Sequence, residues 1–409
     1  MIASSRLQIA RGAEETAKRP TPLLEGAGSP APTRPEPGSD HLRPFSQLYL
    51  HIPFCKHKCG YCDFNAYAGM SGLMRDYVEA LLIELEEASR RFHFTRLESV
   101  YLGGGTPSLL PPELIARLLA GVRARFALTS NAEVTLEANP ASTDPEKLST
   151  WLEGGVNRLS LGLQSFDRSA LGVLERRSDG RMAEGAFKDA RKEGFSNISI
   201  DLMYAVPSQT KRSWEATLTR ALALEPDHIS AYALTFEAGT LLERRRREGM
   251  IEEVPEDLQW DLLDVLVDRL AAADYERYEV SSFAREGSRS RHNQGYWRCR
   301  PCYGAGAGAH SYATDGSRSW RWWNLAQPRR YIASAPDPIA DGERLERDRA
   351  DAEKLMLGLR SVAGVWPAPG FESRLLELER LGLIERRGDL VAPTRRGLDL
   401  HNQIALAVL

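Results

Sequence analysis

The chain has 409 residues, a net charge of -3 at pH 7 and five cysteines. This length suits one large and one smaller domain, since domains usually run to about 100–200 residues. The small net charge argues against a nucleic-acid partner, and no run of about 20 apolar residues marks a membrane span, so we expect peripheral membrane contact at most. An odd number of cysteines without a secretory signal indicates a reducing compartment, so we expect a cytoplasmic protein.

The first 44 residues differ in composition from the rest of the chain. They are rich in Ala, Gly, Ser, Arg and Glu, lack apolar periodicity, and are punctuated by Pro20, Pro22, Pro30, Pro32, Pro35, Pro37 and Pro44. Such a segment buries too little apolar surface to offset its loss of conformational entropy on folding. We therefore predict a disordered N-terminal extension over residues 1–44.

Three cysteines are grouped just after the first apolar run, at 47–51. Cys55, Cys59 and Cys62 form a C-x3-C-x2-C array. Thiolates are the usual protein ligands of a cubane iron–sulfur cluster, and three of them leave one of the four irons open to a small molecule. The spacing favours a 4Fe-4S cluster; the alternatives are a zinc site completed by His51 or His57, and buried thiols without a ligand.

Beyond this array, apolar runs of strand length alternate with amphipathic helical segments. Strands are predicted at 47–51, 97–102, 133–137, 158–163, 198–203 and 228–234. Helices are predicted at 75–91, 112–126, 144–153, 168–193 and 211–223. Alternation of this kind is typical of βα units around a parallel sheet. Six units without an obvious seventh and eighth predict an α/β fold, a partial (β/α)6 barrel of the TIM type over residues 45–285.

Polar or glycine-rich residues lie at or near the ends of these strands, where the loops of a barrel converge and carry its chemistry. They are Gly104, Gly105 and Thr106, then Glu137, Gln164, Asp201 and Tyr232. Any one of them is as well explained by a structural hydrogen bond. Their shared place on one rim favours a ligand site.

Eight ordered stretches from Leu48 onward resemble the oxygen-independent coproporphyrinogen III oxidase-like family of radical S-adenosylmethionine (SAM) proteins. They are LYLHIPFCKHKCGYCDFN, YLGGGTPSLL, VTLEANP, NRLSLGLQSFD, IDLMYAVPSQT, HISAYALTFEAGT, SRHNQGYW and GAGAGAHSY. The resemblance implies a radical SAM barrel with a 4Fe-4S cluster on Cys55, Cys59 and Cys62, whose open iron binds SAM.

The resemblance also implies the SAM contacts. Tyr49 and the Tyr61 backbone would lie beside SAM, and Gly104, Gly105 and Thr106 would hold its methionine end. Glu137 would contact the amino-acid or ribose portion, and Gln164 and Asp201 would contact the ribose hydroxyls. Arg176 would pair with the carboxylate of SAM, and Ala233 would lie against the adenine. A guanidinium suits a carboxylate, and carboxylate or amide acceptors suit a diol. The chain departs from the family at Ser178, where a histidine is common, and Arg177 adjoins Arg176.

Position 64 separates the two main branches of the family, the oxidase proper and the HemW-type heme chaperones. The oxidase branch continues its motif as C-x3-C-x2-C-x-C, whereas this chain has Phe64 at the fourth cysteine position. The stretch 291–297 resembles the H-N-x-x-Y-W motif of the chaperone branch, which implies that His292 contacts heme, packed by Tyr296 and Trp297. The alternative is a loop histidine with a structural hydrogen bond.

The expected function is therefore that of a heme chaperone which binds a 4Fe-4S cluster, SAM and heme and delivers the heme to a respiratory cytochrome. A reductant such as flavodoxin is implied as a second partner, and whether SAM is cleaved is left open. The main alternative is an oxygen-independent coproporphyrinogen III oxidase. A third is a cluster-based sensor with no porphyrin ligand.

The rest of the chain carries weaker signals. Residues 286–349 form a connecting region with a second, weaker heme candidate, His310, and a Cys299/Cys302 pair that we interpret as incidental. Residues 350–409 predict a winged-helix-like domain, with a helix at 375–381 and strands at 383–385 and 390–392. Without a basic surplus, this domain is expected to act as a lid or a partner-docking element.

Overall fold

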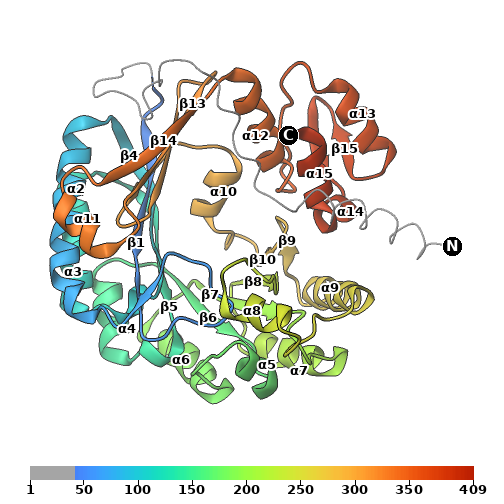
Figure 1. Ribbon diagram of the computed structural model, residues 1–409, viewed down its shortest axis with the longest axis horizontal. Coiled ribbons are helices and arrows are strands. Elements are labelled where there is room, and N and C mark those ends of the chain that lie inside the picture. The colour runs from blue at the N-terminus through green and yellow to red at the C-terminus, as the bar shows by residue number, and fades with distance from the viewer. Residues whose placement is uncertain (1–41) are drawn as a thin grey trace.

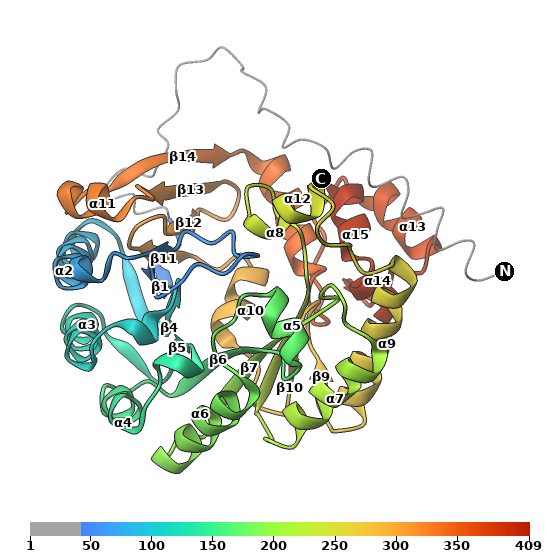
Figure 2. The same cartoon turned by 60° about the horizontal axis from the view of Figure 1, so that its bottom comes forward.

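One curved sheet organises the molecule. The computed structural model describes residues 42–409, so the extension predicted at 1–44 lies almost wholly outside the described residues. The sheet has 12 strands in the order β14-β13-β12-β11-β1-β4-β5-β6-β7-β8-β10-β9, and it curves around α10 (Arg291–Trp297), as Figures 1 and 2 show.

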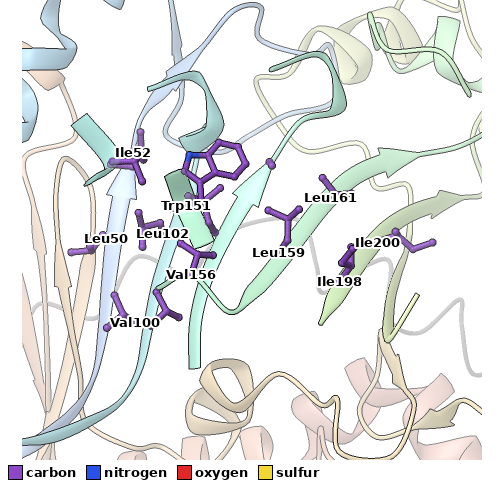
Figure 3. Packing of buried hydrophobic residues seen from close by; sticks show 14 of the residues in the cluster. Leu50, Ile52, Val100, Leu102, Trp151, Val156, Leu159, Leu161, Ile198 and Ile200 are labelled. Carbon is purple, nitrogen blue, oxygen red and sulfur yellow. The ribbon is translucent and has the colours of Figure 1, made fainter. Parts of the chain in front are cut away.

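Six parallel strands form the centre of this sheet and confirm the predicted partial barrel. They are β1 (Phe45–Ile52), β4 (Phe94–Gly104), β5 (Leu128–Ala138), β6 (Arg158–Gln164), β7 (Ile198–Tyr204) and β8 (His228–Ala233). Each pairs in parallel with the next. Their apolar side chains, such as Leu102 and Ile200, belong to one buried cluster with Trp151 (Figure 3).

Helices cover the outer face of the sheet (Figure 2). After successive strands come α2 (Met74–Arg91), α3 (Pro112–Arg125), α4 (Pro145–Glu153), α5 (Arg168–Val173), α6 (Gly180–Glu193), α7 (Lys211–Leu222), α8 (Leu241–Arg247) and α9 (Glu256–Ala271). In α2 the spacing of Val78, Leu81 and Leu85 puts all three in the core, where they are fully buried.

The single helix predicted at 168–193 is wrong, because α5 and α6 are separate. Glu175, between them, has a φ of 54°, a left-handed conformation that ends the first helix. Asp179 then begins α6 as its N-cap, accepting hydrogen bonds from the backbone N–H groups of Arg181 and Met182. The break matters because it carries Arg176.

Residues 286–349 extend the barrel sheet. Strand β11 (Cys302–Ala305) pairs in parallel with β1, and β12 (His310–Thr314), β13 (Ser319–Asn324) and β14 (Ile339–Leu345) follow in antiparallel order. Helix α11 (Pro328–Ser334) joins the last two strands. At the other edge, β10 (Ser282–Ala284) and β9 (Glu276–Arg277) continue the sheet in antiparallel order.

The C-terminal residues form a smaller unit with its own core. It contains α12 (Arg347–Gly358), α13 (Glu372–Arg380), α14 (Arg395–Asp399), α15 (His401–Val408) and a hairpin of β15 (Ile384–Arg387) and β16 (Leu390–Pro393). The predicted helix and hairpin are both present. In the described part of the chain, no helix has the length and apolar character needed to cross a membrane.

Candidate functional site

The cysteine array lies in the loop that joins β1 to α2. A short parallel pair, β2 (Phe54–Cys55) and β3 (Tyr67–Ala68), closes the base of this loop. Within it the backbone N–H of Cys62 donates to the carbonyl of Cys59 at 3.1 Å, and the carbonyl of Gly60 accepts from Leu242 of α8 at 2.8 Å. All three thiols are free and partly buried, and burial raises the pKa of Cys62 to about 11. The cysteine loop is therefore held at its base by the β2–β3 pair and at Gly60 by α8.

The glycine triplet after β4 packs directly against this loop. Gly104 has a φ of 114°, and a Cβ there would lie 2.5 Å from Cε1 of His51. A Cβ on Gly105 would lie 2.8 Å from the backbone oxygen of Phe54. The two amides are already used, since Gly104 donates to Glu137 Oε2 at 3.2 Å and Gly105 to the Ile52 carbonyl at 2.8 Å. The triplet thus allows a close backbone approach that a side chain would prevent.

Thr106 and Arg176 bring polar atoms to two of the cysteines. Thr106 Oγ1 lies 3.5 Å from Cys55 Sγ, and Arg176 Nη1 lies 4.0 Å from Cys59 Sγ. Arg176 Nη2 donates to the carbonyl of Gly162, while Nε is buried and has no hydrogen-bond partner within residues 42–409. A Cβ on Gly162 would lie 3.2 Å from Gln164 Nε2 and 3.4 Å from Arg176 Nη2, so both predicted contacts meet at the end of β6.

Two buried carboxyl groups lie on the neighbouring strands. Glu137 accepts from the Tyr101 hydroxyl at 2.7 Å, and burial raises its pKa to about 7. Asp201 accepts from Ser160 Oγ at 3.3 Å, and burial raises its pKa as well. Sequence reasoning missed Tyr101 and Ser160; their alternation with apolar neighbours on strands already assigned to the barrel could have placed them on the inner face.

The remaining predicted SAM contacts also lie around this end of the barrel. Tyr49 stacks on Tyr101, with ring centroids 6.1 Å apart. Burial raises the pKa of Tyr61, and the positive charge of Arg176 opposes this shift. The Tyr61 ring packs near α5. Ala233 ends β8 in register with Tyr204. Tyr49 and Ala233 thus lie on barrel strands and Tyr61 lies in the cysteine loop, and their contacts with SAM stay predictions.

The two histidines considered as zinc ligands have other partners. His51 Nδ1 is 3.0 Å from the Tyr49 hydroxyl and Nε2 is 2.9 Å from the Asn65 carbonyl, so both ring nitrogens are engaged. His57 Nε2 lies 3.4 Å from a carboxylate oxygen of Glu175. Across residues 42–409, no three His, Cys, Asp or Glu side chains are grouped to hold one metal ion.

His292 lies on α10, inside the barrel, and is only 1% exposed. Its Nδ1 is 2.8 Å from Ser99 Oγ, its Nε2 is 2.8 Å from the Tyr296 hydroxyl, and burial lowers its pKa to about 3. Glu133 accepts from its backbone N–H and fixes the start of α10. The heme contact at His292 stays a prediction, and it requires that the ring give up a bond it makes here.

Among the weaker candidates, His310 is exposed, whereas Cys299 and Cys302 are partly or fully buried. Cys302 is 2% exposed and Cys299 partly buried, and burial raises the pKa of each thiol to about 12. Trp297 packs under the guanidinium of Arg360, 4.4 Å from the ring centroid. Cys302 is therefore a buried residue of the sheet, and Trp297 packs against another side chain of the protein.

Comparison with known proteins agrees with this geometry. Residues 49–221 match the family model of the radical SAM superfamily. The structure of coproporphyrinogen III oxidase (HemN) from Escherichia coli superposes with a TM-score of 0.77 over 90% of both chains, at 23% sequence identity, a likeness of fold. Fold and cysteine loop together define a radical SAM protein.

Curated relatives identify the branch. The chain is 39% identical to the heme chaperone HemW of Mycobacterium tuberculosis over 92% of this chain and 96% of the relative. It is 33% identical to HemW of Bacillus subtilis, over 88% and 98%, and 37% identical to HemW of E. coli, over 75% and 81%. The chain belongs to the HemW family of radical SAM proteins, which confirms the branch predicted from Phe64 and the H-N-x-x-Y-W stretch.

Proposed function

We propose that this protein is a cytoplasmic heme chaperone that carries a 4Fe-4S cluster on Cys55, Cys59 and Cys62, binds SAM and heme, and delivers the heme to a respiratory cytochrome. The observation that carries the proposal is identity of 39% to a protein named heme chaperone HemW, along 92% of this chain. Phe64, in place of a fourth cysteine, supports the same branch.

The residues around the cysteines fit a cluster with SAM. The three thiols belong to one loop, and Arg176 Nη1 lies 4.0 Å from Cys59 Sγ while Arg176 Nε is buried without a partner in residues 42–409. A bound cluster and SAM would supply one-electron chemistry, which the protein itself does not have. Arg176 would pair with the SAM carboxylate, because a guanidinium fork matches that group. Glu137 and Asp201 would accept from hydroxyl or amino groups of the ligand.

The partners follow from the same proposal. The H-N-x-x-Y-W stretch implies a heme contact at His292, so His292→Ala is expected to weaken the Soret band of bound heme, and an unchanged band would remove His292 from the heme site. A reductant such as flavodoxin would deliver an electron to the cluster. Lys56 is exposed on the cysteine loop and is of the right sign to contact an acidic donor.

The fold likeness to HemN keeps the oxidase as a second candidate. Anaerobically reconstituted protein should be supplied with SAM, reductant and coproporphyrinogen III, and the same preparation titrated with heme. The chaperone proposal predicts a saturable Soret band and no protoporphyrinogen. Protoporphyrinogen formation would favour the oxidase, and the absence of any heme-dependent band would favour the sensor; either result overturns the proposal.

A further inference from the structure

His310, which is exposed, and Trp323, which is partly buried, form an aromatic pair beside the cysteine loop. The two residues face each other across β12 and β13. Their rings stack with centroids 5.5 Å apart and planes 27° apart, which holds the imidazole in one orientation. His310 is exposed, and its ring nitrogens have no hydrogen-bond partner among residues 42–409. An oriented imidazole with its lone pair free is unusual in this molecule.

The other described histidines differ from it. His51, His228 and His292 are buried, and both ring nitrogens of each are hydrogen-bonded. His401 Nε2 is 3.1 Å from the Met356 carbonyl, and His57 pairs with Glu175. His93 is exposed, but its carbonyl accepts from Phe45 at the start of β1, the end of the strand opposite the cysteines. His310 is thus the exposed, unpaired histidine of the cysteine end within residues 42–409.

Contacts of Asn65 bring the cysteine loop to this pair. Asn65 Nδ2 donates to the carbonyls of Ala307 and Ala326, at 2.8 and 3.0 Å, close in sequence to His310 and Trp323 respectively. The preceding residue, Phe64, is 64% exposed. The carbonyl of Phe64 accepts from Lys58 Nζ at 3.2 Å. The exposed Phe64 ring and the Lys58 cation therefore lie on a loop that is bonded to the segments next to the exposed His310 and the partly buried Trp323.

This combination matches the chemistry of heme. A porphyrin offers an apolar plane, an iron that accepts imidazole as axial ligand, and propionates that pair with cations. Partial desolvation of the ring, and then the charge of Arg321, lower the pKa of His310, which favours the neutral imidazole that coordinates a metal. Unlike His292, His310 would have to break no hydrogen bond to do so.

We propose that His310 is an axial ligand of the heme iron, with Trp323 and Phe64 against the porphyrin and Lys58 near a propionate. The inference rests on the proposed heme chaperone function and deepens it. A site at the surface also suits a ligand that must be handed to another protein, since the heme can leave without unfolding the barrel.

Heme titrations of the full-length reconstituted protein test this assignment. His310→Ala should weaken hemin binding about tenfold or more and change the Soret maximum, whereas His93→Ala, the matched exposed histidine, should match the wild type. Added imidazole should restore the original Soret maximum in His310→Ala by replacing the missing ligand. Imidazole would not restore the maximum if the variant were merely misfolded. Unchanged cluster content would show that the variant is folded.

The outcomes separate the inference from the function. If the wild type binds hemin and His310→Ala binds it with the same affinity and spectrum, the assignment is overturned and the chaperone proposal stands. If imidazole fails to restore the spectrum of a weakened His310→Ala variant, axial ligation by His310 is likewise overturned. A wild type that binds no hemin would overturn both.

Discussion

Arg176 links the cysteine loop to the end of β6 through contacts with Cys59 Sγ and the Gly162 carbonyl. Arg176→Lys keeps the charge but loses the fork, so SAM affinity should fall about tenfold, roughly 1.4 kcal/mol, while iron content per chain is unchanged. Equilibrium dialysis with SAM under anaerobic conditions measures this. Arg177→Lys, at an exposed neighbouring position, is the control. Equal affinity in both variants would remove Arg176 from the SAM site.

Glu84 is a buried carboxyl group that joins α2 to residues 303–331. It accepts from the hydroxyl of Tyr331 at 2.5 Å, from Asn324 Nδ2 at 2.7 Å and from Gly306 N at 2.9 Å. Burial raises its pKa from 4.5 to about 7. The folded protein therefore holds this proton more tightly than the unfolded chain does.

The pH dependence of stability follows from that difference. Stability contributed by Glu84 is fully present below about pH 4.5 and is lost as the pH rises to about 7, a loss of up to about 3 kcal/mol. Urea unfolding from pH 5 to pH 8 measures it. In Glu84→Gln the decline should be smaller over this window than in the wild type. A decline of the same size in both would mean that Glu84 is ionised throughout.

Cys55, Glu137 and Asp201 could be predicted from the sequence because each is a polar or thiol residue at or near the end of an apolar strand. Their partners could not be predicted in the same way. Tyr101 is 36 residues from Glu137, and Tyr331 is 247 residues from Glu84. Pairings of this kind depend on tertiary packing, which leaves no local pattern in the sequence. The same applies to His292, whose partner Ser99 is 193 residues away.

At the scale of elements, the approach of β4 to the cysteine loop depends on Gly105. A Cβ there would meet backbone atoms of Phe54 and Pro53 at 2.8 and 2.9 Å, and backbone moves less easily than a side chain. Gly105→Ala should therefore displace the loop and lower the iron and sulfide bound per chain after reconstitution by half or more, on the order of 1 kcal/mol or more of strain.

Gly72→Ala is the matched control, since nothing lies within 4 Å of a Cβ at Gly72. Its cluster content should equal that of the wild type. Full cluster content in Gly105→Ala would show that the loop accommodates the added methyl group, and the close approach would then not be required for cluster binding.

The strands of the barrel were predictable because parallel strands buried on both faces read as apolar runs. The break at 174–179 was missed, although Asp179-Gly180 is a helix-start signal within the predicted helix. The pairing of β11 with β1 was not predictable from local pattern, since Cys302 and Gln47 are far apart in the sequence. Local signals specify elements well and distant pairings poorly.

At the scale of the whole molecule, an ion pair between Arg277 and Asp399 joins the C-terminal unit to the barrel. Arg277 Nη1 lies 2.5 Å from Asp399 Oδ1, and the two side chains are 9% and 17% exposed. Asp399→Asn leaves the guanidinium without its counter-charge in a largely buried place, which should cost about 3 kcal/mol. Hydrogen exchange across residues 347–409 should speed up accordingly.

Glu385→Gln removes a carboxylate from an exposed pair with Arg387, in which the side chains are 50% and 51% exposed. An exposed pair contributes about 0–1 kcal/mol, so exchange in this variant should stay close to that of the wild type. If Asp399→Asn exchanges no faster than Glu385→Gln, the C-terminal unit is held mainly by its apolar contacts.

Transfer of heme to an acceptor tests the central claim most directly. Heme-loaded protein should be mixed anaerobically with a purified respiratory apocytochrome, and the Soret bands of both followed with time. We predict that the chaperone band decays as the holocytochrome band grows, with equal amounts of heme lost and gained. Heme that stays with this protein, or transfer no faster than from free hemin, would contradict the account.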